Sequence, residues 1–110
     1  MDKRKVKYGS PCTIFRNNGE YGVIITDRYA ATVVDVVSHK EMVVRRNEAW
    51  RTDFIKNKWT FDGKELSKDH PEPYHFTLRN NGTWVEKGMS MNNPEADTLT
   101  IGYRDHFEEW

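Results

Sequence analysis

The chain has 110 residues, which is enough for one domain and too few for two ordinary ones. Its 17 basic and 17 acidic side chains give a formal net charge of zero, which argues against a protein that holds nucleic acid by diffuse charge. No apolar run is long enough for a membrane span or a signal peptide. The single cysteine, Cys12, excludes an internal disulfide and a cysteine-based zinc site. Composition therefore predicts a cytoplasmic protein with no membrane partner.

The zero net charge is the sum of two unequal halves. Residues 1–60 hold 12 basic and 7 acidic side chains, whereas residues 61–110 hold 5 basic and 10 acidic ones. Either the halves neutralise each other in the fold, or the molecule presents one basic and one acidic surface. In the second case, a few placed arginines would hold an anionic ligand.

The first half of the chain reads as a charged tail followed by strands. Residues 1–8 are predicted as the tail and residues 9–110 as a single β domain. A tight turn is predicted at Asn18-Gly19, because this pair supplies the positive φ values of a hairpin. β-Branched residues dominate the strongest strand and disfavour a helix there. Strands are predicted at residues 13–15, 21–26, 29–37 and 42–46, with a short turn at 38–41.

The second half contains one ambiguous segment, at residues 47–56, where Asn47 could cap a single helical turn over 47–51. The longest loop is predicted at 62–73, which carries Gly63, Pro71 and Pro73. Alternation places Tyr74, Phe76 and Leu78 on one inward face, and places Leu99, Ile101 and Tyr103 on another. Strands are predicted at 58–61, 74–79, 83–87 and 98–103, with an Asn-Gly turn at 80–82 and a polar loop at 88–94.

About seven or eight short strands at close spacing predict an all-β domain. An SH3-like small barrel or a rolled antiparallel sheet is favoured by three features of the sequence. These are the segment 8–14 that leads into the first strand, the long strand at 29–37 and the tight turn to Met42. In this arrangement, residues 57–87 form an added hairpin that extends the sheet.

Three blocks of the sequence resemble a family of small phage and bacterial proteins whose biochemistry is not settled. Residues 27–37 resemble the pattern S-D-R-x-A-x-T-V-V-E-V, and residues 76–88 resemble F-T-L-R-K-N-G-R-W-x-x-K-G, with Asn80 in place of the lysine. Residues 102–107 resemble the closing pattern G-x-R-x-x-Y. The resemblance implies a phage or mobile-element setting, and hence the host-cell cytoplasm, but no particular reaction.

The residues give little support to an enzyme. No zinc-protease, phosphate-loop or nucleophile-elbow motif is present. His70 and His75 could share a metal with Asp69 or Glu72, but they lack the fixed spacing of a ligand pair. Cys12 reads as a buried, inert thiol. A non-catalytic protein without metal or cofactor is therefore predicted.

Arginine and aromatic residues lie close together at several places in the sequence. A guanidinium group pairs with phosphate oxygens in a bidentate manner, and aromatic rings stack on bases. This pattern predicts a binding protein for a nucleotide-like anionic ligand. The resemblance to phage proteins implies the setting, in which the protein acts in counter-defence and sequesters such a ligand as a signal. The candidate ligand-binding residues are Arg28, Tyr29, Arg51, Arg79, Trp84, Lys87, Tyr103 and Arg104.

Two alternatives remain open at this stage. The first is a protein-binding inhibitor of a host defence protein or of a nucleic-acid enzyme, and the second is a nucleic-acid-binding small barrel. Exposed strand edges also favour a homo-oligomer.

Overall fold

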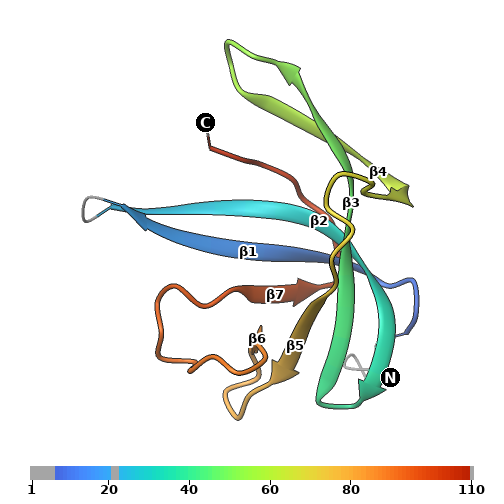
Figure 1. Cartoon of the computed structure of the whole chain (residues 1–110), viewed down its shortest axis with the longest axis vertical. Coiled ribbons are helices and arrows are strands. Elements are labelled where there is room, and N and C mark those ends of the chain that lie inside the picture. The colour runs from blue at the N-terminus through green and yellow to red at the C-terminus, as the bar shows by residue number, and fades with distance from the viewer. Residues whose placement is uncertain (1–6, 21–22, 110) are drawn as a thin grey trace.

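The computed structural model describes residues 7–20 and 23–109 and confirms the all-β class (Figure 1). Tail residues 1–6 and the Tyr21-Gly22 part of the second predicted strand lie outside the described residues. No helix occurs in the described residues, and hence none that is long and apolar enough to cross a bilayer. The strands are β1 (Pro11–Glu20), β2 (Val23–Ser38), β3 (Glu41–Asp53), β4 (Lys58–Leu66), β5 (Tyr74–Leu78), β6 (Trp84–Glu86) and β7 (Thr98–Ile101).

Six strands form a barrel-like ring of antiparallel pairs. The order is β2-β1-β7-β6-β5-β3, and a further pairing between β2 and β3 closes the ring. The predicted barrel or rolled sheet is therefore confirmed. The added hairpin is present, but its predicted bounds of 57–87 are wrong. It is formed by Asn47–Asp53 and β4, whereas β5 and β6 belong to the wall of the ring.

The core lies inside this ring and follows the alternation of the strands. Ile14, Val33, Val44 and Phe76 are completely buried, and Tyr74, Trp84 and Ile101 pack against this cluster from the side. Since neighbouring residues of a strand point to opposite faces, each strand supplies only every second side chain to the core. This explains why a chain with 36% hydrophobic residues closes a barrel.

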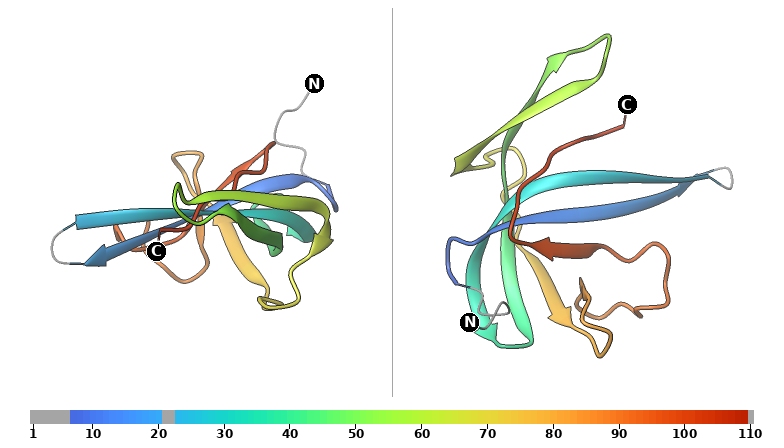
Figure 2. Two further views of the ribbon diagram at one scale, coloured as in Figure 1. Left: turned by 90° about the horizontal axis from the view of Figure 1, so that it is seen from above. Right: turned by 180° about the vertical axis from the view of Figure 1, so that it is seen from behind.

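Strand β3 belongs to the ring in its first half and to a separate hairpin in its second half. Its first half, Glu41–Arg46, pairs with β2 and β5 in the barrel, and its second half, Asn47–Asp53, pairs with β4 alone. The helical turn considered for 47–51 is therefore wrong, since pairing with β4 keeps this segment extended. The hairpin of Asn47–Asp53 and β4 projects away from the ring in Figure 1 and in the right view of Figure 2, and we call it the arm.

A bend separates the arm from the barrel. Asn47 pairs with Leu66 but Ala49 pairs with Phe61, so that residues 62–65 bulge out of β4 opposite Glu48. The carboxylate of Asp62 accepts hydrogen bonds from the backbone N–H groups of Lys64 and Glu65 and shapes this bulge. The loop predicted over 62–73 is therefore shorter, because residues up to Leu66 belong to β4.

The predicted turns differ in outcome. Residues 39–40 connect β2 to β3 as expected, and Gly82 adopts a left-handed φ of 83° in the predicted Asn-Gly turn. The turn predicted at Asn18-Gly19 is wrong, because β1 continues to Glu20 and pairs with β2 to its end.

The C-terminal strap, which we define as residues 102–109, crosses the outside of the ring. Arg28 and Phe107 exchange two backbone hydrogen bonds of 2.8 and 2.9 Å, and Gly102 N–H donates to Pro11 O. Strand β7 ends at Ile101, so Tyr103, which was predicted to share its inward face, lies on the strap and is exposed.

Candidate docking surface

The eight residues predicted as a ligand site lie in three separate regions. Arg28, Tyr29, Tyr103 and Arg104 belong to β2 and the strap, whereas Arg79, Trp84 and Lys87 belong to the β5–β6 hairpin. Arg51 lies on the arm. The eight residues therefore do not form one common surface.

The predicted site residues on β2 and on the strap contact other residues of the chain. The Nε atom of Arg28 lies 2.7 Å from a carboxylate oxygen of Asp105, and its guanidinium carbon lies 5.2 Å from the centre of the Phe107 ring. Tyr29 is a buried core residue and not a pocket wall. The guanidinium of Arg104 donates to Ala31 O and to the Thr32 hydroxyl.

The residues of the β5–β6 hairpin have local partners as well. Arg79 donates to the Thr77 hydroxyl and to the backbone oxygen of Glu86, and Trp84 packs against the barrel core. Lys87 forms an ion pair with Glu41 at 2.9 Å. These contacts hold the hairpin on the neighbouring strands.

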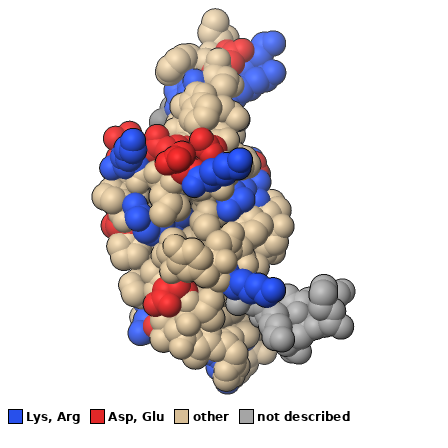
Figure 3. Space-filling model, turned by 90° about the vertical axis from the view of Figure 1, so that its right-hand side faces the viewer, with Lys and Arg blue, Asp and Glu red and all other residues tan. Residues whose placement is uncertain are grey.

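The tip of the arm, residues 53–57, displays two apolar side chains to solvent. Phe54 is 68% exposed and Ile55 is 93% exposed, and Trp50 on the adjoining part of β3 is 50% exposed. Large apolar side chains that stand together at the end of a projection are typical of an interaction site. The top of the space-filling view shows uncharged atoms at this end of the molecule, with lysine or arginine atoms and a smaller group of aspartate or glutamate atoms beside them (Figure 3).

Local hydrogen bonds brace this tip. One carboxylate oxygen of Asp53 accepts from the backbone N–H groups of Ile55 and Lys56, both at 3.0 Å. Asn57 adopts a left-handed φ of 53°, which asparagine tolerates better than most residues. Its side-chain oxygen accepts from the indole N–H of Trp59 at 3.0 Å. Phe54 and Ile55 therefore lie on a turn that is stabilised by hydrogen bonds.

Cationic side chains outnumber carboxylates in the segment that carries the apolar tip. Arg51, Lys56 and Lys58 lie within the segment 50–59, and Asp53 supplies its one carboxylate. The guanidinium of Arg51 lies over the rings of Phe54 and Trp59, at 5.3 and 4.9 Å from their centres. The arm thus ends in an apolar surface with a basic margin.

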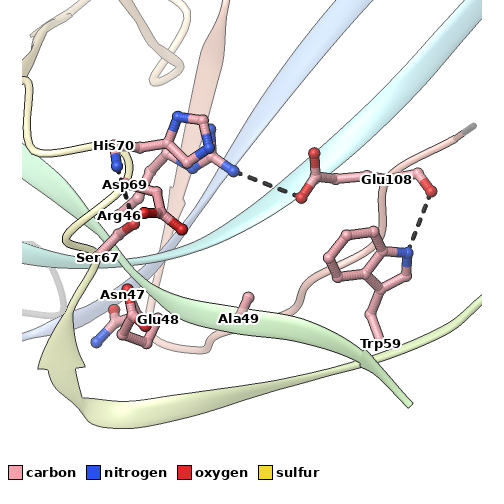
Figure 4. Close-up of a pocket in the computed structure, with 9 residues that line it drawn as sticks. All are labelled: Arg46, Asn47, Glu48, Ala49, Trp59, Ser67, Asp69, His70 and Glu108. Atoms are coloured by element: carbon pink, nitrogen blue, oxygen red, sulfur yellow. Dashed lines mark hydrogen bonds and ion pairs between the residues drawn. The ribbon is translucent and has the colours of Figure 1, made fainter.

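A polar hollow of about 220 Å³ lies at the bend, at the base of the arm (Figure 4). The buried guanidinium of Arg46 lies 3.9 Å from the centre of the Tyr29 ring and 3.5 Å from the carboxylate of Glu108. The residues that line the hollow are Arg46, Asn47, Glu48, Ala49, Trp59, Ser67, Asp69, His70 and Glu108.

A buried histidine fixes the strap beside this hollow. The side chain of His106 is 0% exposed, its Nε2 atom lies 2.8 Å from Glu108, and its Nδ1 atom accepts the backbone N–H of Ala30. Burial lowers the pKa of His106 despite the nearby Glu108 carboxylate, which raises it. The neutral ring with a proton on Nε2 is the form that satisfies both neighbours.

The other candidate chemical groups are the Cys12 thiol and the side chains considered as metal ligands. Burial raises the pKa of the Cys12 thiol to about 12, so that it stays protonated near neutral pH. Within residues 7–20 and 23–109, no three His, Cys, Asp or Glu side chains are grouped as metal ligands. His70 lies 3.9 Å from Glu72, and both are exposed.

The two charge halves of the sequence partly neutralise each other. Three ion pairs join an arginine of residues 1–60 to a carboxylate of residues 61–110, and Lys87 with Glu41 forms a pair of the opposite sense. The three are Arg16–Asp97, Arg28–Asp105 and Arg46–Glu108. This agrees with the first of the two interpretations of the zero net charge.

No protein-family model, curated protein or solved structure matches this chain. The resemblance to small phage and bacterial proteins therefore stays a prediction.

Sequence reasoning missed the tip of the arm. The signal was present, because Phe54 and Ile55 stand between the turn-forming residues Asp53 and Asn57, where an apolar pair cannot lie on a strand face. It also missed the contacts that Arg46 and His106 make with Glu108, because no spacing in the sequence indicates them.

Proposed function

We propose that this protein is a non-catalytic binding protein that docks on a partner protein through the tip of its arm. The observation that carries the proposal is the exposure of Phe54 and Ile55 on a turn braced by Asp53. Burying a phenylalanine or isoleucine side chain contributes about 1.5–3 kcal/mol, so this pair can supply a substantial part of a binding free energy.

The chemistry of the tip specifies the partner surface. An apolar pocket would take Phe54 and Ile55, and carboxylates at its rim would face Lys56 and Lys58. Charges at such a rim mainly accelerate association and select the partner, while the apolar centre supplies affinity. The partner is therefore a protein with an apolar pocket and an acidic rim, which develops the first alternative drawn from the sequence.

The nucleotide-like ligand and the counter-defence role stay predictions. The protein partner is favoured because most of the predicted cationic residues have partners within the chain. Arg28 and Lys87 are in ion pairs, and Arg79 and Arg104 donate to backbone oxygens. A guanidinium held in this way is less available to a phosphate group.

A matched pair of variants tests the docking proposal. Phe54→Ser with Ile55→Ser removes the apolar tip, whereas Val36→Thr with Val37→Thr removes a second exposed apolar pair, at the far end of β2. A partner is isolated by photo-crosslinking from position 55 and then purified for titration. We expect at least about 30-fold weaker binding for the tip variant, and unchanged binding for the β2 variant.

The controls separate the alternatives. Circular dichroism and the urea midpoint establish that both variants are folded. Binding that is lost on nuclease treatment, or that also occurs with vesicles of anionic lipid alone, would contradict a protein partner. Equal losses in the two variants would contradict the assignment of docking to the tip.

A further inference from the structure

Two residues of the strap, on either side of the Arg28–Phe107 backbone pair, connect the barrel to the arm. On the barrel side, Nδ1 of His106 accepts the backbone N–H of Ala30 at 3.2 Å. On the arm side, the backbone oxygen of Glu108 accepts from the Asn57 side-chain amide at 2.9 Å and from the Trp59 indole N–H at 3.2 Å. We call this set of contacts the latch.

The two sides of the latch are coupled directly. Nε2 of His106 lies 2.8 Å from a carboxylate oxygen of Glu108, whose backbone holds the arm. The rings of His106 and Trp59 are also in contact, with their centres 5.0 Å apart. A change at the His106 ring therefore reaches the arm through both its polar and its aromatic neighbour.

The latch spans the bend of the arm. Beyond the barrel, β3 and β4 are out of register between Asn47 and Ala49, where residues 62–65 bulge. Bulges of this kind let a hairpin bend relative to its sheet. Figure 4 shows Glu108 bonded to Arg46 on one side and to Trp59 on the other, across the hollow at this bend. The latch contacts thus bridge the barrel and the arm across this bend.

We propose that the latch is an acid-released switch, in which protonation of His106 frees the strap from Ala30 and lets the arm move about the bend. A protonated imidazole carries N–H on both nitrogens, so Nδ1 no longer accepts a hydrogen bond. The backbone N–H of Ala30 is then left buried beside a second donor. The consequence for docking rests on the proposed function of the arm, but the switch itself does not.

The surrounding charges set the pH at which the switch acts. Glu108 and Asp105 on the strap favour the protonated ring, whereas Arg46 on β3 disfavours it. Tyr29 on β2 and Trp59 on β4 contribute uncharged rings. Burial is the largest influence and lowers the pKa of His106, which keeps the latch closed at neutral pH.

Nuclear magnetic resonance of the full chain, without any partner, tests the switch. The indole N–H of Trp59 reports the arm side, the His106 ring reports protonation, and the backbone amides of Val33, Val44 and Phe76 report the barrel. On acidification, we expect the indole signal to shift with the midpoint of the His106 titration. Its exchange with solvent should rise on the order of tenfold or more, while the barrel amides stay protected.

Two variants complete the test. In His106→Asn, the side-chain oxygen takes the place of Nδ1 but does not titrate, so the acid transition of the indole should disappear. In Glu108→Gln, the backbone contacts remain but the carboxylate that favours protonation is lost, so the midpoint should move to lower pH.

Three results would overturn the proposal. These are an indole signal that ignores the His106 titration, an identical transition in His106→Asn, and loss of the barrel amides at the same pH as the indole signal. None of them bears on docking, which is measured separately with the tip variants at neutral pH.

Discussion

One substitution, phenylalanine to alanine, can be compared at two opposite places in the fold. Phe76 on β5 is completely buried in the barrel, whereas Phe54 at the tip of the arm is 68% exposed. Phe76 pairs with Met42 on β3 and with Glu86 on β6, so it lies where the ring of strands is held together. We expect Phe76→Ala to destabilise the protein strongly and Phe54→Ala to leave its stability nearly unchanged.

The magnitudes follow from burial. Replacing a fully buried phenylalanine by alanine costs ~3–5 kcal/mol, because the transfer free energy is lost and a cavity remains. A domain of this size has a free energy of unfolding of about 5–15 kcal/mol, so Phe76→Ala removes a large fraction of it. Phe54 contacts Arg51 by a cation–π interaction at 5.3 Å, which at an exposed site contributes about 0.5–1 kcal/mol.

Urea unfolding followed by tryptophan fluorescence measures both variants. At an m-value of ~2 kcal/mol per molar, a loss of ~4 kcal/mol lowers the midpoint by about 2 M. We expect a shift of this size for Phe76→Ala and less than about 0.5 M for Phe54→Ala. A comparable shift for Phe54→Ala would refute the reasoning, because the tip would then support the fold rather than serve a partner.

Further predictions concern titration, reactivity, backbone strain and ligand binding. The lowered pKa of His106 means that the unfolded chain binds this proton more tightly, so the free energy of unfolding should fall as the pH drops below about 6.5 in the wild type, and less in His106→Asn. Cys12, with its pKa raised to about 12, should resist a thiol reagent at pH 8 until urea unfolds the chain, and rapid labelling of the native protein would contradict its burial. Gly82→Ala should cost about 1 kcal/mol in urea unfolding, because the φ of 83° strains any residue with a Cβ atom. A nucleotide-like ligand at ~100 times its dissociation constant should add about 2.7 kcal/mol to the stability, and a panel of nucleotides and cyclic dinucleotides without any thermal shift would count against that ligand class.

Short sequence patterns predicted the strands and turns whose conformation depends on neighbouring residues in the chain. The alternation of Tyr74, Phe76 and Leu78 identified a strand that lies in the barrel wall, and Gly82 identified its turn. Residues 47–53 were not predictable in this way, because their extended form depends on pairing with β4. Asn18 and Gly19 have turn-forming character, but their pairing with Ile25 and Ile24 keeps them in a strand.

The candidate site failed to converge for a geometric reason. The prediction paired three arginines with the ring next to them in sequence, such as Arg28 with Tyr29, and paired Arg79 with Trp84 across a hairpin. Adjacent residues of a strand point to opposite faces, so such neighbours do not share a surface. Arg51 lies over the ring of Phe54 and over that of Trp59, its partner across the β3–β4 pair. Cross-strand register, which the sequence does not state, decides these contacts.

The distribution of ion pairs connects the zero net charge to the proposed function. Arg16, Arg28 and Arg46 lie in or beside the barrel, and each pairs with a carboxylate of the acidic second half. These pairs neutralise much of the excess positive charge of residues 1–60. The segment 50–59 departs from this pattern, because it carries three cationic side chains and the single carboxylate of Asp53, whose oxygen is bonded to the backbone of the tip. The positive margin favours the solubility of the free protein, and in the proposed function it is the feature that selects an acidic-rimmed pocket over other exposed protein surfaces.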